Sequence, residues 1–312
     1  YFLDKPSYKN AFLSSLTCAL VIDVKILGII TPFIILVFYI LMLMNSKKFF
    51  KKNILKIIIF FCLLILFTII FWPYLWNDPI NNLLSTFKSM SGYQWRGGIF
   101  YLNEYISALN LPWHYPIVWI LISTPIIYLL LFFLGSVLIL KRLAFRFLKL
   151  STEKEFNDMW RGNKERMDII FFSIFYFTLL LVIELNSTLY GGWRHLYFIY
   201  PCLIFISIRG LELISRNFST IYVFLLIIPF LLYLGMWMTK NHPFQFVYFN
   251  KIAGNNVGNN FELDYWGTSN RNALKYIINN DKRDSVNVYV LSNSPYYFGL
   301  LLMDVRICRR LA

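Results

Sequence analysis

Long uncharged apolar runs, separated by short polar segments, dominate the pattern along the chain. A helix needs roughly 20 residues to cross about 30 Å of hydrocarbon. We identify six candidate spans: Ile26–Met44, Ile57–Trp76, Tyr115–Leu140, Ile169–Ile183, Leu196–Ile208 and Asn217–Thr239. A seventh run, Ala11–Ile22, is too short to span alone. Any one run could be a buried core helix, but six in series favour a polytopic membrane protein.

The composition supports this interpretation. Of the 312 residues, 58% are hydrophobic, 20% are aromatic and only 15% are charged. Soluble domains average about 45–50% apolar and about 25% charged residues. These values exclude a disordered chain, and four cysteines are too few for a disulfide scaffold. They also argue against a soluble enzyme of ordinary type.

The net charge of +14 is distributed unevenly between the loops. Segments 45–53, 141–167 and 209–218 carry 14 Lys and Arg in 46 residues, whereas segments 73–114 and 185–194 carry 3 in 52. The positive-inside rule places the first set in the cytoplasm. We interpret the basic residues of that set as solvated faces that set the topology, and we expect no nucleic-acid partner.

This orientation makes the loop 73–114 and the segment 240–312 external, and residues 1–10 cytoplasmic if the first two apolar runs form a hairpin. The external loop is rich in Trp and Tyr, which is typical of a membrane interface, and Asn82–Met90 is a candidate interfacial helix. The chain opens with Tyr1 rather than Met and has no signal-peptide pattern. We therefore expect it to lack its natural N-terminus.

The composition changes after Thr239, where His242–Asn250 is aromatic and expected to be extended. Further on we predict a helix over Asn270–Asn279 with Ser269 as its N-cap, a strand over Ser285–Ser292 and a helix over Pro295–Met303. The fold prediction is an all-α polytopic membrane region, residues 1–240, with about six full transmembrane helices plus one short helix. A small α/β extracytoplasmic domain, residues 241–312, follows it and could be truncated.

One external segment places an ionisable group near hydrocarbon depth. Gly191, Gly192, Trp193, Arg194 and His195 precede an apolar run of only 13 residues, so the helix must begin near Trp193 to span. A charge at that depth is costly and is by default a functional hypothesis. The alternative is that Arg194 extends to the interface. The two glycines let backbone or ligand approach closely.

Asp23 and Lys25 pose the same question, because they interrupt the apolar pattern on the same predicted side. Lys25 either pairs with Asp23 or converges with Arg194 on an anion. All three histidines, His114, His195 and His242, fall at external ends of spans, but none has a metal-ligand spacing. We expect no metal and no cofactor.

Four segments together resemble a known family. They are Trp72-Pro73-Tyr74-Leu75-Trp76-x-Asp78-Pro79, Gly192-x-Arg194-His195-x-x-Phe198-x-x-Pro201, His242-Pro243-x-Gln245-x-Val247-Tyr248-Phe249-Asn250 and Phe261-Glu262-x-Asp264-Tyr265-Trp266-Gly267. Their order and topology resemble bacterial integral-membrane glycosyltransferases of the C-type superfamily. That group is akin to the dolichyl-phosphate-mannose–protein mannosyltransferases and the aminoarabinose transferases. The resemblance covers about Ala11 to Ile278.

The resemblance implies an inverting hexosyltransferase in the bacterial inner (plasma) membrane. It implies a sugar donor linked to polyprenyl phosphate, and transfer on the extracytoplasmic face to a hydroxyl of a protein, lipid or glycan acceptor. Fixed cations would stabilise the departing phosphate, and the candidates for that role are Arg194, Lys25 and His195. Candidates for binding substrate hydroxyls are Asp78, Glu262 and Asp264.

The chain departs from the family at the catalytic base. In the family this carboxylate lies in a first external loop, which would fall upstream of Tyr1. No acidic pair near Tyr1–Asn10 matches it, and Asp4 stands alone. We therefore leave the base unassigned, and we expect the chain to be inactive as it stands if the base is absent.

Two other classes stay open. A lipid-linked glycan transporter or flippase would need charged or broken helices along a route through the membrane, whereas the spans from Ile57 to Ile183 carry almost no charge near their centres. A non-enzymatic assembly subunit would explain the aromatic loops equally well, but it gives Arg194 no role.

Overall fold

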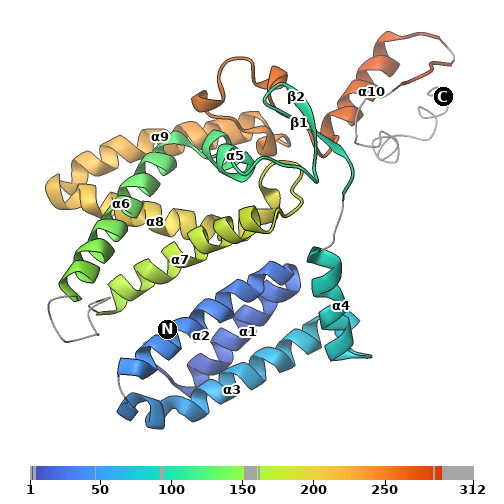
Figure 1. Cartoon of the computed structure of the whole chain (residues 1–312). Coiled ribbons are helices and arrows are strands. Elements are labelled where there is room, and N and C mark those ends of the chain that lie inside the picture. Colours follow the sequence, from blue (N-terminus) through green and yellow to red (C-terminus); the bar gives the residue numbers. More distant parts are fainter. Residues whose placement is uncertain are drawn as a thin grey trace. The chain divides into compact units, whose positions relative to one another are not determined.

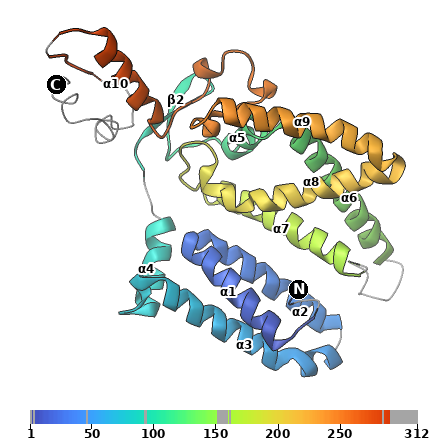
Figure 2. The same cartoon turned by 180° about the vertical axis from the view of Figure 1, so that it is seen from behind.

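The computed structural model describes residues 5–45, 47–91, 95–150, 162–283 and 285–289, together with Phe2 and Trp160. This part of the chain is mostly helical (Figures 1 and 2). Its helices are α1 (Tyr8–Val24), α2 (Ile30–Asn45), α3 (Lys47–Phe71), α4 (Pro79–Ser91), α5 (Tyr115–Ser123), α6 (Ile126–Leu150), α7 (Gly162–Glu184), α8 (Tyr200–Asn217), α9 (Thr220–Lys240) and α10 (Thr268–Asn280). A two-stranded hairpin pairs β1 (Gly98–Tyr101) with β2 (Glu104–Ser107).

Five helical segments of the described residues are long and apolar enough to cross a membrane, which indicates an integral membrane protein. They are Lys52–Phe71, Ile126–Arg146, Gly162–Glu184, Arg194–Asn217 and Ile221–Lys240. The remaining predicted span is Ile26–Met44, which begins as a 3₁₀ turn over Ile26–Ile29 and continues as α2. Its apolar part, Ile26–Leu41, is shorter than the five membrane-length segments. A helix is confirmed over the predicted segment Asn82–Met90, as part of α4, and its place at a membrane interface stays a prediction.

The chain forms two compact units, which we describe separately. The first comprises Tyr1–Gln94, Ile127–Ser187 and Leu196–Val223, and the second comprises Trp95–Ile126, Thr188–His195 and Phe224–Ala312. In the first unit, α1 lies along α3 and α2 packs against α7, as both views show.

Two glycines let α6 and α8 cross closely in the first unit. A Cβ at Gly135 would lie 2.0 Å from the Ile206 carbonyl oxygen, and one at Gly210 would lie 2.0 Å from the Leu131 carbonyl oxygen. Small residues at such crossings are the usual means by which membrane helices pack, because little apolar driving force exists between helices in lipid.

Helices α6, α7 and α8 enclose a charge cluster that the sequence did not predict. Asp168 is fully buried, with its Oδ2 2.9 Å from Nη1 of Arg142 and its Oδ1 2.7 Å from Nε of Arg209. The expectation that the basic residues of 141–167 and 209–218 are solvated is therefore wrong for Arg209, which is 6% exposed, and only partly right for Arg142, whose side chain is 17% exposed. Burial of a carboxylate is tolerated only when cations and donors compensate it, and the two arginines do so.

In the second unit, the predicted span Tyr115–Leu140 is broken at Thr124 and Pro125. Proline has no N–H, so the Leu121 carbonyl cannot find its normal helical partner four residues later. Asn250 replaces it, since its Nδ2 donates to the carbonyl oxygens of Leu121 at 2.7 Å and Thr124 at 2.6 Å.

The backbone completes this attachment. The Asn250 N–H donates to the Ile122 carbonyl oxygen at 2.8 Å, and Asn250 Oδ1 accepts from the Ile252 N–H at 2.8 Å. Asn250 is only 6% exposed, so water does not provide an alternative partner for these groups. The segment 241–250 is consequently held against α5. It is not simply extended as expected, because it contains a 3₁₀ turn over Gln245–Val247.

The hairpin of β1 and β2 contacts the chain after Asn250, at Phe261 and Glu262. Phe261 forms a bridge to Tyr101 of β1, and the Glu262 N–H donates to the Phe100 carbonyl oxygen at 3.1 Å. Phe261 itself is buried against Tyr101 and Trp119, with ring centroids 5.9 and 5.7 Å away.

The C-terminal expectations are only partly covered by the described residues. Helix α10 begins at Thr268, earlier than predicted, and the prediction that Ser269 caps it is wrong because Ser269 lies inside the helix. Residues 285–289 contain only an isolated bridge at Val286. The rest of the predicted strand, the helix over Pro295–Met303 and Asp4 lie outside the described residues, so the α/β domain stays a prediction.

Replacing Asn250 with aspartate tests the attachment to the broken helix. The change removes both Nδ2 donors and sets an anion against carbonyl oxygens, and each buried unsatisfied group costs about 1–3 kcal/mol. We expect a loss of at least about 2 kcal/mol of folding free energy, seen as a lower midpoint of thermal unfolding in detergent. The control Asn260→Asp removes a similar but exposed amide contact to Asn256, and an equal effect of both variants would contradict the assignment.

Candidate functional site

A glycine pair shapes the loop that carries Arg194. Gly191 and Gly192 have φ values of +61° and +68°, in the left-handed region that glycine adopts without strain. A Cβ at Gly192 would lie 3.1 Å from the Trp119 ring, and one at Gly191 would lie 2.9 Å from the Tyr265 ring. The backbone therefore passes directly over two aromatic side chains. The sequence predicted that the two glycines would allow a close approach, and the structure shows this approach between the loop backbone and the rings of Trp119 and Tyr265.

Trp193 ties the same loop to the broken helix. Its Nε1 donates to Ser123 Oγ at 2.7 Å, and that hydroxyl donates to the Trp119 carbonyl oxygen at 2.6 Å. Trp193 is only 3% exposed, so its indole also supplies apolar contact. The turn before Arg194 is thus fixed to α5.

Arg194 is half-buried and lies among three aromatic rings. Its Cζ is 4.5 Å from the ring centroid of Trp266, 4.6 Å from that of Tyr190 and 5.3 Å from that of Tyr265. Tyr190 in turn stacks on Trp95, with the ring centroids 4.6 Å apart. Ring faces attract a guanidinium without accepting its in-plane N–H groups in hydrogen bonds.

The hydrogen bonds of Arg194 leave its forked end available. Nε donates a long hydrogen bond of 3.4 Å to Nε2 of His195. Within the described residues, Nη1 and Nη2 donate none, and no carboxylate forms an ion pair with the side chain. A guanidinium held by its faces, with its donor edge unoccupied, suits a planar or tetrahedral oxyanion.

Glu262 is the acidic residue whose charge interacts with Arg194. Burial raises the pKa of Glu262 above its ordinary value, the charge of Arg194 lowers the pKa, and the charge of Asp264 raises it. The raised pKa means that burial and the neighbouring carboxylate outweigh the attraction of Arg194. The fold thus retains a carboxylate in a place that disfavours its charge, which is characteristic of functional sites.

Two buried polar atoms beside this acid form no hydrogen bond of normal geometry within the described residues. They are Tyr115 Oη and Trp119 Nε1, and the side chains are 0% and 3% exposed. Burial, and after it the charge of Glu262, raise the pKa of Tyr115, which places this hydroxyl near the acid. The Tyr115 hydroxyl also interacts with the Trp119 side chain and the Gly192 backbone, so these two polar groups are incompletely paired, which is uncommon for buried groups. The sequence pattern did not single out either residue.

Tyr101 and His114 form the neighbouring pair, with Oη and Nδ1 2.7 Å apart. The rings of Tyr101 and Tyr115 also lie close, with centroids 5.0 Å apart, and burial raises the pKa of Tyr101 to about 12. The hairpin residue Tyr101 therefore joins His114 to the wall of the site.

The predicted phosphate-binding group is only partly brought together. His195 lies beside Arg194 and packs edge-on against Tyr190, with ring centroids 4.6 Å apart. Lys25 belongs to the other unit, at the end of α1, so its convergence with Arg194 stays a prediction. Both carboxyl oxygens of Asp23 are buried and accept no hydrogen bond within the described residues.

Two of the predicted substrate-binding acids have local structural roles. Asp78 precedes α4 and accepts from the Asn81 N–H at 3.1 Å and from Asn81 Nδ2 at 2.6 Å, and these bonds lower the pKa of Asp78. Asp264 accepts from the N–H groups of Thr268 at 3.1 Å and Ser269 at 2.6 Å, at the start of α10. Both acids satisfy the free N–H groups of a helix N-terminus.

The described residues contain no group of three or more His, Cys, Asp and Glu side chains arranged to hold a metal ion. Arg194, His195 and Glu262 are polar groups of the candidate site, Tyr115 Oη and Trp119 Nε1 lie in its buried part, and the surrounding rings supply its apolar surface.

Substitution of Gly192 tests the close approach to Trp119. In Gly192→Ala, the left-handed backbone costs about 1–2 kcal/mol, and contact with the Trp119 ring adds to that cost. Gly162→Ala is the control, because Gly162 has a φ of +78° but a Cβ added there would meet nothing within 4 Å. We expect the thermal midpoint to fall further for Gly192→Ala, and equal losses would contradict a packing role.

The raised pKa of Glu262 predicts a pH-dependent stability. A carboxyl group whose pKa is higher in the folded state stabilises less as pH rises from the unfolded pKa through the folded one. Glu262→Gln cannot ionise and so avoids this loss of folding stability at high pH. Its thermal midpoint should therefore exceed that of the wild type at pH 8. The difference should vanish below about pH 4. Glu104→Gln, at an exposed site, should show no such trend, and a lower midpoint for Glu262→Gln at pH 8 would contradict the prediction.

Comparison with known proteins gives no relative. No protein-family model, curated protein or solved structure matches the chain. A functional assignment therefore depends on the geometry around Arg194 and Glu262, on the helices that could span a membrane, and on the sequence resemblance.

Proposed function

We propose that the site around Arg194 and Glu262 binds a sugar linked to polyprenyl phosphate and supports transfer of that sugar to an acceptor hydroxyl. The observation that carries this proposal is a half-buried arginine enclosed by three aromatic rings, whose Nη groups donate no hydrogen bond within the part of the chain that the structure describes. Its charge interacts with a carboxylate that has a raised pKa. This combination fits an anionic leaving group next to a polyol.

Arg194 would bind the phosphate of the donor. As the bond between the anomeric carbon and the phosphate oxygen breaks, negative charge develops on the departing lipid phosphate. A fixed cation in a site with little water stabilises that charge more than it stabilises the ground state. The guanidinium can offer two parallel N–H groups to phosphate oxygens, and His195 is the adjacent second donor.

Glu262 would bind hydroxyl groups of the sugar or acceptor. A carboxyl group with a raised pKa can accept a hydrogen bond when ionised and donate one when protonated. Tyr115 Oη and Trp119 Nε1 would add partners in the buried part of the site. Tyr190, Tyr265 and Trp266 offer the flat apolar surfaces that ligand sites usually combine with a few polar groups. The catalytic base is not assigned among these residues.

The helices that could span a membrane suit a lipid-borne donor. The membrane-length part of α9, Ile221–Lys240, is apolar and only 6% of its most apolar stretch is buried inside the protein. Most of its residues belong to the same unit as Arg194. We further propose that this site faces the extracytoplasmic side of a bacterial plasma membrane, as the loop charges predict.

Removal of the Arg194 guanidinium tests donor binding. In nanodiscs, Arg194→Ala should weaken the binding of a polyprenyl phosphate by at least about tenfold, because a charge-assisted phosphate contact contributes about 1.5–3 kcal/mol. Arg194→Lys keeps the positive charge but loses the forked donor geometry, so its affinity should lie between those of the wild type and Arg194→Ala. Arg96→Ala, an exposed substitution in the same unit, is the matched control. Unchanged binding in Arg194→Ala would exclude the phosphate role.

Comparison of bare and sugar-bearing polyprenyl phosphate distinguishes the proposed role of Glu262 from that of Arg194. Glu262→Gln should bind the bare polyprenyl phosphate at least as tightly as the wild type, because it removes an anion that interacts with Arg194, but should bind the sugar-bearing form more weakly. If Glu262→Gln has the same affinity as the wild type for both ligands, Glu262 does not contact the sugar.

A further inference from the structure

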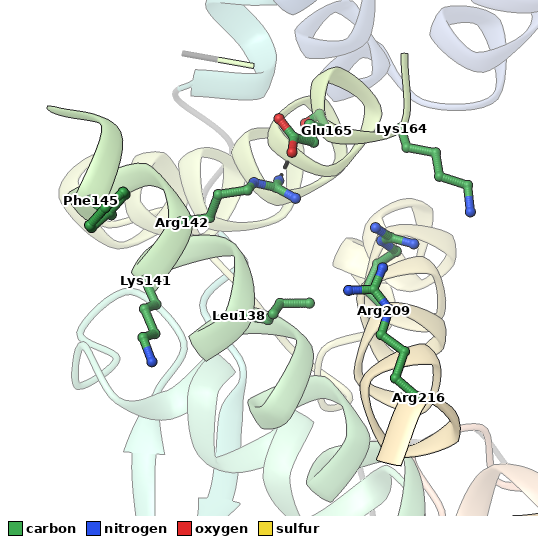
Figure 3. Close-up of a pocket in the computed structure, with 8 residues that line it drawn as sticks. All are labelled: Leu138, Lys141, Arg142, Phe145, Lys164, Glu165, Arg209 and Arg216. Carbon is green, nitrogen blue, oxygen red and sulfur yellow. Dashed lines mark hydrogen bonds between the residues drawn. The ribbon is translucent and has the colours of Figure 1, made fainter. Parts of the chain in front are cut away.

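A second candidate site lies in the first unit, where the ends of α6 and α8 meet the beginning of α7. The pocket there has a volume of about 590 Å³, within the range of small-ligand sites. Its lining comprises Leu138, Lys141, Arg142, Phe145, Lys164, Glu165, Arg209 and Arg216 (Figure 3). Five of these eight side chains are cationic and one is anionic.

Part of this charge is already compensated within the protein. Asp168 pairs with Arg142 and Arg209, and Glu212 pairs with Arg209. Glu165 lies 2.7 Å from Arg146. Arg142 and Arg209 are therefore paired within the helix packing, and they do not supply free charge to the pocket.

The remaining cations of the pocket are not neutralised by a close ion pair within the described residues. Within the described residues, neither Lys141 nor Arg216 has a carboxylate within ion-pair distance. Lys164 reaches Glu212 only at 4.0 Å, and its side chain is 78% exposed. Figure 3 shows Arg209 and Arg216 extending from α8 toward the space that Leu138 and Arg142 face from α6.

The pocket also has an apolar side. Leu138 and Phe145 line it, and Phe145 is 61% exposed. On the same helix, Val137 and Leu148 are 62% and 72% exposed. These side chains lie in and just beyond the membrane-length segment Ile126–Arg146. The cationic lining is thus continuous with a helix surface suited to acyl chains.

We propose that this pocket binds the headgroup of an anionic phospholipid. Its basic residues come from segments whose charge predicts the cytoplasmic side, where anionic lipids attract basic clusters next to transmembrane helices. A free phosphate would explain the cations but not the apolar Leu138 and Phe145 beside them. A phospholipid satisfies both, with its phosphodiester near Arg216 and Lys164 and its acyl chains along α6.

The test uses a pair of charge-matched double variants. Lys164→Gln with Arg216→Gln removes one Lys and one Arg from the pocket and leaves Asp168, Arg142 and Arg209 in place, at the cost only of the 4.0 Å contact of Lys164 with Glu212. Arg271→Gln with Lys275→Gln removes the same two residue types from exposed positions of α10. Native mass spectrometry in detergent measures binding of phosphatidylglycerol and phosphatidylcholine to each protein, and circular dichroism checks that helicity is retained.

We expect the wild type and the α10 variant to bind phosphatidylglycerol more tightly than phosphatidylcholine. The pocket variant should lose at least about fivefold in affinity for phosphatidylglycerol, the amount expected for a single basic residue near a membrane surface. Inorganic phosphate at equal concentration should not displace the lipid. Equal binding of both lipids by the wild type, an equal loss in both double variants, or displacement by inorganic phosphate would overturn the proposal.

Discussion

The second unit depends on how the protein satisfies the carbonyl groups that Pro125 leaves without helical partners. Three backbone carbonyls at the end of α5 receive hydrogen bonds from one residue, Asn250, which is 129 positions away from Leu121. An unpaired buried carbonyl costs about 1–3 kcal/mol, so separation of Asn250 from α5 would be expensive. The helix break thereby becomes an attachment point for a distant segment rather than a defect.

The same end of α5 holds the two segments that supply the candidate site. Trp193 binds Ser123, which fixes the loop before Arg194, and Asn250 fixes the chain that leads to Glu262. The glycine pair lets the first segment lie against Trp119 and Tyr265. Arg194 and Glu262 are thus positioned by contacts to the same end of α5, and fixed positions of this kind are what the proposed function requires.

The sequence predicted the parts of this arrangement that local pattern controls. Apolar run length predicted the helices, and the short run after Arg194 singled out that arginine. The pattern did not predict the break at Pro125, because the run Tyr115–Leu140 stays apolar across it and the compensating Asn250 lies far away in sequence. It also assigned Asp78 and Asp264 no capping role, because charge alone does not distinguish a ligand-binding acid from a helix cap.

The arginines illustrate why residue type was insufficient. Arg209 is stabilised by ion pairs with Asp168 and Glu212, which accept hydrogen bonds from its Nη2 and Nη1 groups. Arg194 is stabilised by ring faces, which leave the net charge and the Nη groups available. Both arginines are held by their surroundings, yet only the second can bind an added anion without first losing an internal partner. The difference in available hydrogen-bond donors between the two arginines therefore arises from what compensates each charge, and this depends on tertiary contacts rather than on local sequence.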